Sequence, residues 1–192
     1  MAPLIAVLAS QNPHKLAELR EGLPGWRLEA LAAGDWPEET GETYYENAVL
    51  KARFGRLLAP ADAWVLGEDS GIECAALDGA PGLHSARWAS RGDQADALLE
   101  RLAGESDRGA RMVTELVALP PGGGEIHVRG EIAGEIAAAR RGSTGFGYDP
   151  IFVPAGQQRT IAELGEAWKR ANSHRARAAQ ALLAAVRSGA AS

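Results

Sequence analysis

Short apolar runs and helical stripes alternate along the first third of the chain. Leu4 to Leu8 is a continuous apolar run, which is typical of a strand covered on both faces. Asn12-Pro13 then has the composition of a helix cap followed by proline in the first helical position. The spacing that follows predicts a helix from Pro13 to about Glu21. Trp26 to Leu31 is predicted as a second strand.

The pattern continues with a second helix and a third strand. Thr43 and Glu46 have the spacing of a capping box, and the positions that follow predict a helix over residues 43–58. Its apolar positions are Tyr45, Ala48, Val49 and Ala52. Ala63 to Gly67 is predicted as a buried strand, and it is expected to end in the polar stretch Glu68-Asp69-Ser70-Gly71.

The second half of the chain carries turn-rich segments between its apolar runs. Two β-like runs flank a Gly/Pro turn, which indicates an antiparallel hairpin. The expected elements are a helix over roughly 92–103, hairpin strands Met112–Leu119 and Glu125–Ile132, a glycine-rich loop over 141–149, and a final helix from a Ser173 cap through Val186, with Ala176, Ala179, Leu183 and Val186 inward. Because strands and helices alternate early and a hairpin comes late, we expect an α/β fold with a mixed sheet.

Length and charge narrow the classes of protein. The 192 residues suit a single domain over 1–192, long enough to bury a core without disulfides. Twenty basic residues against 25 acidic ones give a net charge of −5, which argues against binding along a nucleic acid. No run approaches the roughly 20 apolar residues of a membrane helix. The only cysteine, Cys74, excludes an intrachain disulfide and fits a cytoplasmic protein.

The segment Ser10 to Lys15 is a candidate anion site. It lies between a predicted strand and a helix start, where free N–H groups favour an anion. Lys15 in the first turn is unfavourable for the helix dipole unless a negative partner is present. The alternative is an ordinary capped helix with a surface lysine.

The acidic pair Glu68-Asp69 is a candidate metal site. Carboxylates with no soft ligand nearby suit Mg²⁺, which takes one or two carboxylates plus substrate phosphates. The alternative is a solvated junction between strand and turn. The acidic loop with Glu38, Glu39 and Glu42 could add a ligand or simply be solvated.

Two later segments could contact a nucleotide. In the loop around Gly145 to Pro150, glycines allow close backbone approach, while Phe146 and Tyr148 offer faces for a base or anchor the loop to the core. Ser173-His174-Arg175 places two basic residues in the first turn of a helix, just after Lys169 and Arg170. A basic helix end on the surface is the alternative.

Taken in order, these segments resemble the inosine/xanthosine triphosphate pyrophosphatase family. The family's opening motif, S/T-x-N-x-x-K-x-x-E, is present as Ser10, Asn12, Lys15 and Glu18. The further blocks are Glu39-Thr40-Gly41 to Glu46-Asn47-Ala48 with Lys51-Ala52, then Glu68 to Gly71, Gly79 to Gly82 with Ser85-Ala86-Arg87, Gly145 to Pro150, and Ser173-His174-Arg175. The resemblance covers about Leu8 to Leu183.

The resemblance implies a role for each block. Asp69 is expected to be the general base and a magnesium ligand, with Glu38 and Glu68 as further metal ligands. Ser70 is expected to contact the substrate. The other implied substrate-binding residues are Ser10, Gln11, Asn12, Pro13, His14 and Lys15 for the triphosphate, Phe146, Gly147, Tyr148 and Asp149 around the base, and Lys169, His174 and Arg175 to complete the pocket.

The resemblance also implies a fold and an activity. The fold is an elongated mixed sheet flanked by helices, with two lobes and a central cleft, in a homodimer. The activity is Mg²⁺-dependent hydrolysis of ITP, dITP, XTP and dXTP to the monophosphate and pyrophosphate. Donors from His174 and Arg175 would pair with a 6-keto oxygen and be left unsatisfied by a 6-amino group. The alternatives are a pyrophosphatase of other modified nucleotides on a related fold, and a non-catalytic nucleotide-binding module.

Overall fold

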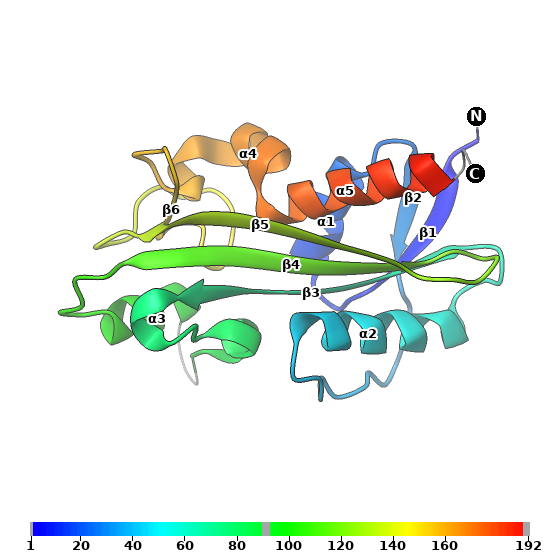
Figure 1. The fold of residues 1–192 in the computed structure, drawn as a ribbon, viewed down its shortest axis with the longest axis horizontal. Coiled ribbons are helices and arrows are strands. Elements are labelled where there is room, and N and C mark those ends of the chain that lie inside the picture. The colour runs from blue at the N-terminus through cyan, green and yellow to red at the C-terminus, as the bar shows by residue number, and fades with distance from the viewer. Residues whose placement is uncertain (1, 90–92, 190–192) are drawn as a thin grey trace. The chain divides into compact units, whose positions relative to one another are not determined.

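One six-stranded mixed sheet flanked by helices organises the chain in the computed structural model, which describes residues 2–89 and 93–189 (Figure 1). The strand order is β2-β1-β3-β4-β5-β6, with β1 parallel to β2 and β3, and β5 antiparallel to β6. The strands are β1 (Leu4–Ala9), β2 (Trp26–Ala30), β3 (Trp64–Cys74), β4 (Gly109–Leu119), β5 (Ile126–Ile136) and β6 (Phe152–Pro154). The α-helices are α1 (Pro13–Gly22), α2 (Tyr44–Leu58), α3 (Gln94–Arg101), α4 (Ile161–Asn172) and α5 (His174–Gly189), with short 3-10 helices at Ala75–Leu77 and Gly82–Arg87. The expected α/β fold with a mixed sheet is confirmed.

The chain divides into two compact units that are interleaved in sequence. Unit 1 comprises Met1–Asp69, Thr114–Gly130 and Arg175–Ser192, and unit 2 comprises Ser70–Val113 and Glu131–His174. The strands β3, β4 and β5 each begin in one unit and end in the other. None of the helices in the described ranges is both long enough and apolar enough to cross a membrane.

Unit 1 has apolar contacts on both faces of its part of the sheet. On one face, Leu19 of α1 and Ala179 of α5 are buried with Leu116 of β4. On the other face, Ala48 of α2 is buried against β4. The axis of α2 comes so close to β3 that a Cβ atom at Gly67 would lie 2.1 Å from the carbonyl oxygen of Ala48. This close approach brings the side chains of α2 directly onto β3.

Unit 2 has an apolar core of its own. Ile72 of β3 and Leu98 of α3 are fully buried with Phe152 of β6 and Ile161 of α4. Cys74 lies in the same core, and burial raises the pKa of its thiol to about 11. A thiol in this environment is a small buried apolar group, because the reactive thiolate is strongly disfavoured.

The helix starts in unit 1 follow the predicted chemistry. Asn12 caps α1, and its side-chain oxygen accepts a hydrogen bond from the backbone nitrogen of His14 at 2.9 Å. Thr43 and Glu46 form a complete capping box at the start of α2. The sequence therefore predicted these helix starts correctly, because both depend on local hydrogen bonds.

The third strand is longer than predicted. It continues through the acidic pair to Cys74, and the isolated acidic end expected after Gly67 is wrong. Ile72 and Cys74 are buried beyond the pair, so the sheet needs this segment as a strand. Glu68 and Asp69 therefore lie inside a strand, both of them buried, and the alternative of a solvated turn is excluded.

Two later elements were not predicted, and one side chain faces away from its expected position. No element was predicted at β6 or at α4, although Thr160 and Glu163 form a second capping box. The left-handed conformation of Gly165, with φ of +83°, interrupts the helical stripe of α4 and hides its period. In α2 the buried tyrosine is Tyr44, whereas Tyr45 is exposed and donates to Glu125. The helix expected over 92–103 is α3, and residue 92 lies outside the described residues.

Candidate active site

The acidic pair of unit 1 lies just beyond the carboxyl end of β1. The register pairs Ala9, the last residue of β1, with Gly67 of β3, so Glu68 and Asp69 follow where β1 has ended. The segment Ser10 to Lys15 leaves β1 at the same level. Ligands of open α/β sheets bind at such strand ends, and this is where the predicted anion and metal residues meet.

Glu68 is fully buried among cations. Lys15 Nζ lies 2.7 Å from Glu68 Oε2, and Arg175 Nε lies 3.1 Å from Oε1. Thr114 Oγ1 lies 3.4 Å from Oε1 as a further donor. Burial by itself would raise the pKa of Glu68, but the charges of Lys15 and Arg175 outweigh it and hold the pKa well below its usual range. Glu68 is therefore a carboxylate with its charge already compensated.

Arg175 has a second acidic partner in unit 1. Its Nη1 pairs with Glu18 of α1, and the guanidinium is almost completely buried between Glu18 and Glu68. Lys15 and Glu18 are three residues apart on α1, so they project from the same side of that helix. These contacts connect four charged side chains in a row, from Lys15 through Glu68 and Arg175 to Glu18. These contacts connect Arg175 to two carboxylates, and its expected contact with the base stays a prediction.

Asp69 faces α2. Lys51 Nζ lies 2.7 Å from Asp69 Oδ1, and Asn47 Nδ2 donates to Oδ2 at 3.3 Å. The same Lys51 Nζ lies 2.6 Å from Glu39 Oε1 and donates to the carbonyl oxygen of Glu68 at 3.2 Å. Burial raises the pKa of Asp69, and the opposing charges of Lys51 and Lys15 offset only part of this. A buried carboxylate with a raised pKa is a better base than an exposed one.

The segment Ser10 to Lys15 forms a tight turn into α1. Ser10 Oγ accepts from the backbone nitrogen of Asn12 at 3.2 Å, while Asn12 Oδ1 accepts from the nitrogens of His14 and Lys15. Gln11, Pro13 and His14 are exposed, and the first turn of α1 holds no acidic residue. The positive end of α1 therefore has no acidic residue of its own, and the Lys15 ammonium group in its first turn is paired with Glu68.

A second group of predicted residues lies in unit 2. Lys169 of α4 is buried, with its Nζ 2.5 Å from Asp149 Oδ2 and 4.1 Å from the centre of the Phe146 ring. Asp149 also accepts from the backbone nitrogen of Phe146 at 2.8 Å. Tyr148 is buried in the apolar core and donates to the carbonyl oxygen of Ser85 at 2.8 Å. Tyr148 thus anchors the loop, and Phe146 remains the partly exposed aromatic face.

The remaining predicted residues are placed separately. Ser70 is half-buried on β3, and His174 is buried as the first residue of α5. Glu38 is exposed, and it is Glu39 that meets Lys51. Within residues 2–89 and 93–189, no three His, Cys, Asp or Glu side chains are gathered as a ready metal site.

Four residues near the acidic pair were not assigned roles from the sequence. Asn47 and Lys51 belong to the second block of the family resemblance, and Glu18 belongs to the first, so a signal for them was present. Thr114 lies in an apolar strand, and no sequence pattern marks it. Their contacts depend on which strands and helices are adjacent, and this information is tertiary.

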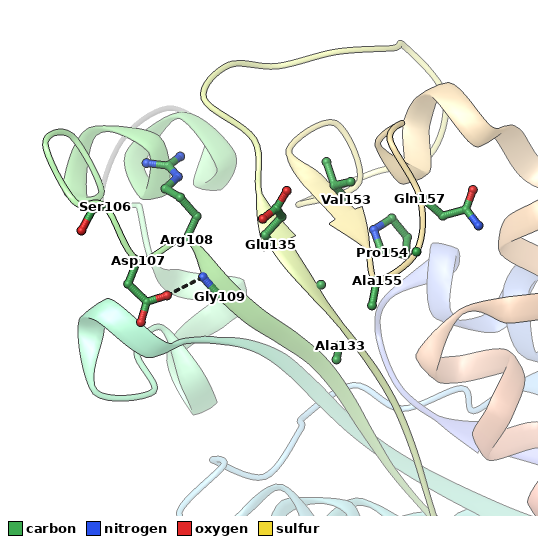
Figure 2. Close-up of a pocket in the computed structure, with 12 residues that line it drawn as sticks. Ser106, Asp107, Arg108, Gly109, Ala133, Glu135, Val153, Pro154, Ala155 and Gln157 are labelled. Atoms are coloured by element: carbon green, nitrogen blue, oxygen red, sulfur yellow. Dashed lines mark hydrogen bonds between the residues drawn. The ribbon is translucent and has the colours of Figure 1, made fainter.

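A hollow of about 620 Å³ in unit 2 contains none of the predicted site residues (Figure 2). The loop before β4, the end of β5 and the segment after β6 line it. Its polar groups support the fold: Asp107 Oδ1 accepts from the nitrogen of Gly109 at 2.8 Å, and Arg108 donates to the carbonyl oxygens of Leu102, Ile136 and Ala137. The hollow is therefore separate from the acidic pair.

Comparisons with known proteins agree on one family. The model of the Ham1 family matches residues 6–185. A dITP/XTP pyrophosphatase of Deinococcus deserti is 44% identical over 95% of this chain and 89% of its own, and one of Mycobacterium bovis is 47% identical over 95% of each chain. The solved structure of the Staphylococcus aureus Ham1 protein superposes with a TM-score of 0.84 at 34% identity, covering 96% of this chain and 99% of that one.

Proposed function

The chain belongs to the Ham1 family, and from this membership together with the charged site on β3 we propose that it hydrolyses deaminated purine nucleoside triphosphates such as dITP and XTP. The products are the nucleoside monophosphate and pyrophosphate. The observation that carries the proposal is the pair of carboxylates, Asp69 and Glu39, that meet on one ammonium group. Such an arrangement holds a cation next to a base, which phosphoryl transfer requires.

The donor set at this point fits a hard divalent cation. Glu39 Oε1 and Asp69 Oδ1 both lie within 2.7 Å of Lys51 Nζ, so two carboxylate oxygens face one place. Mg²⁺ is bound by one or two carboxylates together with substrate phosphates. We therefore assign Asp69 and Glu39 as the residues that would hold Mg²⁺, with Glu39 in the place expected of Glu38. When bound, the ion would neutralise charge on the phosphate chain.

Glu68 has a different part in this proposal. Its two oxygens are already engaged by Lys15 and Arg175, so it holds cations of the protein itself. Lys15 stands at the start of α1, where backbone N–H groups favour an anion. A triphosphate at Ser10 to Lys15 would receive the Lys15 ammonium group, while Arg175 would keep the charge of Glu68 compensated.

Asp69 acts as the general base in this mechanism. It takes the proton from the water molecule that attacks the phosphorus atom, and its raised pKa makes it a stronger base than an exposed aspartate. Hydrolysis of a phosphoanhydride needs charge stabilisation and orientation more than a covalent intermediate. No cysteine nucleophile is required, and Cys74 is buried in the core of unit 2.

The residues of unit 2 supply the base-binding part of the proposal. Phe146 offers an aromatic face on which a purine can stack, and Lys169, fixed by Asp149, is a buried donor beside it. A donor of this kind suits the 6-keto oxygen of inosine and xanthosine, whereas the 6-amino group of adenosine would leave it unsatisfied. We further propose that the protein is a cytoplasmic homodimer, as the family resemblance implies.

A panel of nucleoside triphosphates tests the proposal. The purified protein is incubated with ITP, dITP, XTP, GTP, ATP and CTP, with Mg²⁺ or with EDTA, and pyrophosphate and orthophosphate are measured separately. We expect pyrophosphate only, Mg²⁺ dependence, and a preference for ITP, dITP and XTP. Orthophosphate as the product would contradict a pyrophosphatase, and a preference for CTP would favour the alternative, a pyrophosphatase of other nucleotides.

A further inference from the structure

Asn47 joins two segments of the site through a single buried amide group. It lies in the first turns of α2, and its side chain is almost completely shielded from solvent. Its Oδ1 accepts from the backbone nitrogen of Gly41 at 2.8 Å, and its Nδ2 donates to Asp69 Oδ2 at 3.3 Å. The orientation of the amide is fixed chemically, because a backbone N–H can only donate and a carboxylate oxygen accepts.

The loop before α2 approaches Asn47 closely. A Cβ atom at Gly41 would lie 2.7 Å from Asn47 Oδ1 and 2.9 Å from the Asn47 nitrogen, so only glycine fits at this point. The next two backbone nitrogens, those of Glu42 and Thr43, donate to Glu46 Oε2 at 2.6 and 3.2 Å. The end of the acidic loop is thereby tied to α2, two residues after Glu39.

The two oxygens of Asp69 have separate partners. Oδ1 faces Lys51, the place shared with Glu39, and Oδ2 is held by Asn47. Without Asn47, the contact to Oδ2 is lost and the contact of Lys51 to Oδ1 remains, so the plane of the carboxylate is less strongly fixed. The Asn47 amide therefore helps to fix the plane in which the Asp69 carboxylate faces the place where the two carboxylates meet.

We propose that Asn47 is the positioning residue of this site, which aligns the Asp69 carboxylate and the Glu39 loop on a common point for a divalent cation. This inference rests on the proposed function for the identity of the cation and of the reaction. The proposed role of Asn47 is indirect, because its side chain is expected to touch neither substrate nor metal. Residues that orient metal ligands commonly change metal affinity or activity by about 10- to 100-fold when removed.

The test uses three kinds of variant in the full-length protein. Asn47→Ala removes both hydrogen bonds, and Asn47→Leu removes them while filling the volume. Gly41→Ala leaves Asn47 in place but forces the loop away from its amide oxygen. Thr43→Ala is the matched control, because it removes the helix cap at the same end of α2 and leaves the Asn47 contacts intact.

Two measurements separate positioning from general stability. Mn²⁺ binding to the nucleotide-free protein is followed by electron paramagnetic resonance, and kcat and KM for ITP are measured with Mg²⁺. We expect both Asn47 variants and Gly41→Ala to weaken Mn²⁺ binding about tenfold or more and to lower kcat about 10- to 100-fold, with KM changed less than about threefold. Thr43→Ala should lower the melting temperature and leave the Mn²⁺ affinity and kcat within about twofold of the wild type.

The opposite pattern would overturn the proposal. Unchanged Mn²⁺ affinity and kcat in Asn47→Leu, with only a lower melting temperature, would make Asn47 a structural residue. A loss in Thr43→Ala equal to that in the Asn47 variants would attribute the effect to the helix start. If the wild-type protein binds Mn²⁺ but does not hydrolyse ITP, the proposed function fails, while the Mn²⁺ titrations still decide the role of Asn47.

Discussion

Glu68 and Asp69 are consecutive residues of β3, yet their carboxylates are held by different helices on opposite faces of the sheet. Glu68 meets Lys15 of α1 and Arg175 of α5, and Asp69 meets Lys51 and Asn47 of α2. The alternation of a strand produces this separation, because successive side chains point to opposite faces. Two adjacent carboxylates can thus have different roles and separate side-chain partners.

Replacement of Asp69 by asparagine should abolish turnover and preserve nucleotide binding. The shape of the side chain is kept, but the base and one negative charge at the cation site are lost. General-base catalysis contributes about 10²- to 10⁴-fold, so kcat should fall by at least that range. Single-turnover hydrolysis of ITP and equilibrium binding of ITP measure the two effects. The control is Glu73→Gln, which lies on β3 like Asp69 and removes an exposed ion pair with Arg111 of β4.

Lys15→Ala should weaken the binding of ITP much more than the binding of IMP. The lysine is assigned to the phosphate chain, and the monophosphate presents fewer charges to it. Isothermal titration of the wild type and the variant with each nucleotide gives the change in Kd for ITP and the change in Kd for IMP. Arg20→Ala, on the same helix but paired with Glu29 at the surface, should change neither. Equal losses for ITP and IMP would remove Lys15 from the triphosphate site.

Arg175→Ala tests the role expected for that residue in base recognition. Because its guanidinium is buried between Glu18 and Glu68, we expect kcat/KM for ITP and ATP to fall by the same factor. Leaving buried carboxylates without their cation should also cost about 3–5 kcal/mol of stability. Urea unfolding and steady-state kinetics measure both effects. A selective loss for ITP of roughly 10- to 150-fold would instead support contact with the 6-keto group.

The lowered pKa of Glu68 predicts that its contribution to the free energy of unfolding is lost at acid pH. The folded protein keeps Glu68 ionised well below its usual pKa, whereas the unfolded chain takes up a proton near pH 4.3. Its contribution is therefore complete above that pH and declines as the pH falls towards the folded pKa. The difference in unfolding free energy between the wild type and Glu68→Gln should be largest at neutral pH and narrow on acidification. Glu29→Gln, at an exposed pair, should show a small difference.

Cys74 should be inert in the folded protein. Burial raises its pKa to about 11, against an ordinary value near 8.5, and the side chain is shielded by the core of unit 2. Labelling with a disulfide reagent at mildly alkaline pH should be slower than that of a free thiol by about 100-fold or more. One thiol per chain should react at once in concentrated guanidinium chloride. Rapid labelling without denaturant would show that this core opens.

The sequence predicted those parts of the fold that depend on local chemistry. Asn12 and the Thr43–Glu46 box determine helix starts through hydrogen bonds between neighbours, and they were found correctly. The length of β3 was predicted wrongly, because two consecutive acidic residues resemble the end of a strand when their partners are unknown. The strand continues there because Ile72 and Cys74 are buried beyond the pair, and Lys15, Arg175 and Lys51 compensate the buried charges.

The site divides in the same way. The residue types at Lys15 and Asp69 indicated anion and metal chemistry, and the family resemblance assigned their roles. The proposal that Glu39 serves as a metal ligand in place of Glu38 rests on how the acidic loop meets α2, which a linear pattern does not encode. The pairing of Arg175 with Glu18 joins residues 157 positions apart, and only the folded chain brings them together.

The interleaving of the two units has a consequence for synthesis on the ribosome. The apolar core of unit 1 includes Ala178, Ala179 and Leu182 of α5, which are translated after the whole of unit 2. The chain's amino-terminal segment therefore cannot complete its core while unit 2 is being made, and Arg175 reaches Glu68 only after unit 2 has been translated. A nascent chain stalled before α5 would expose the apolar face of β1 and β4 and recruit chaperones, whatever the stability of the finished protein.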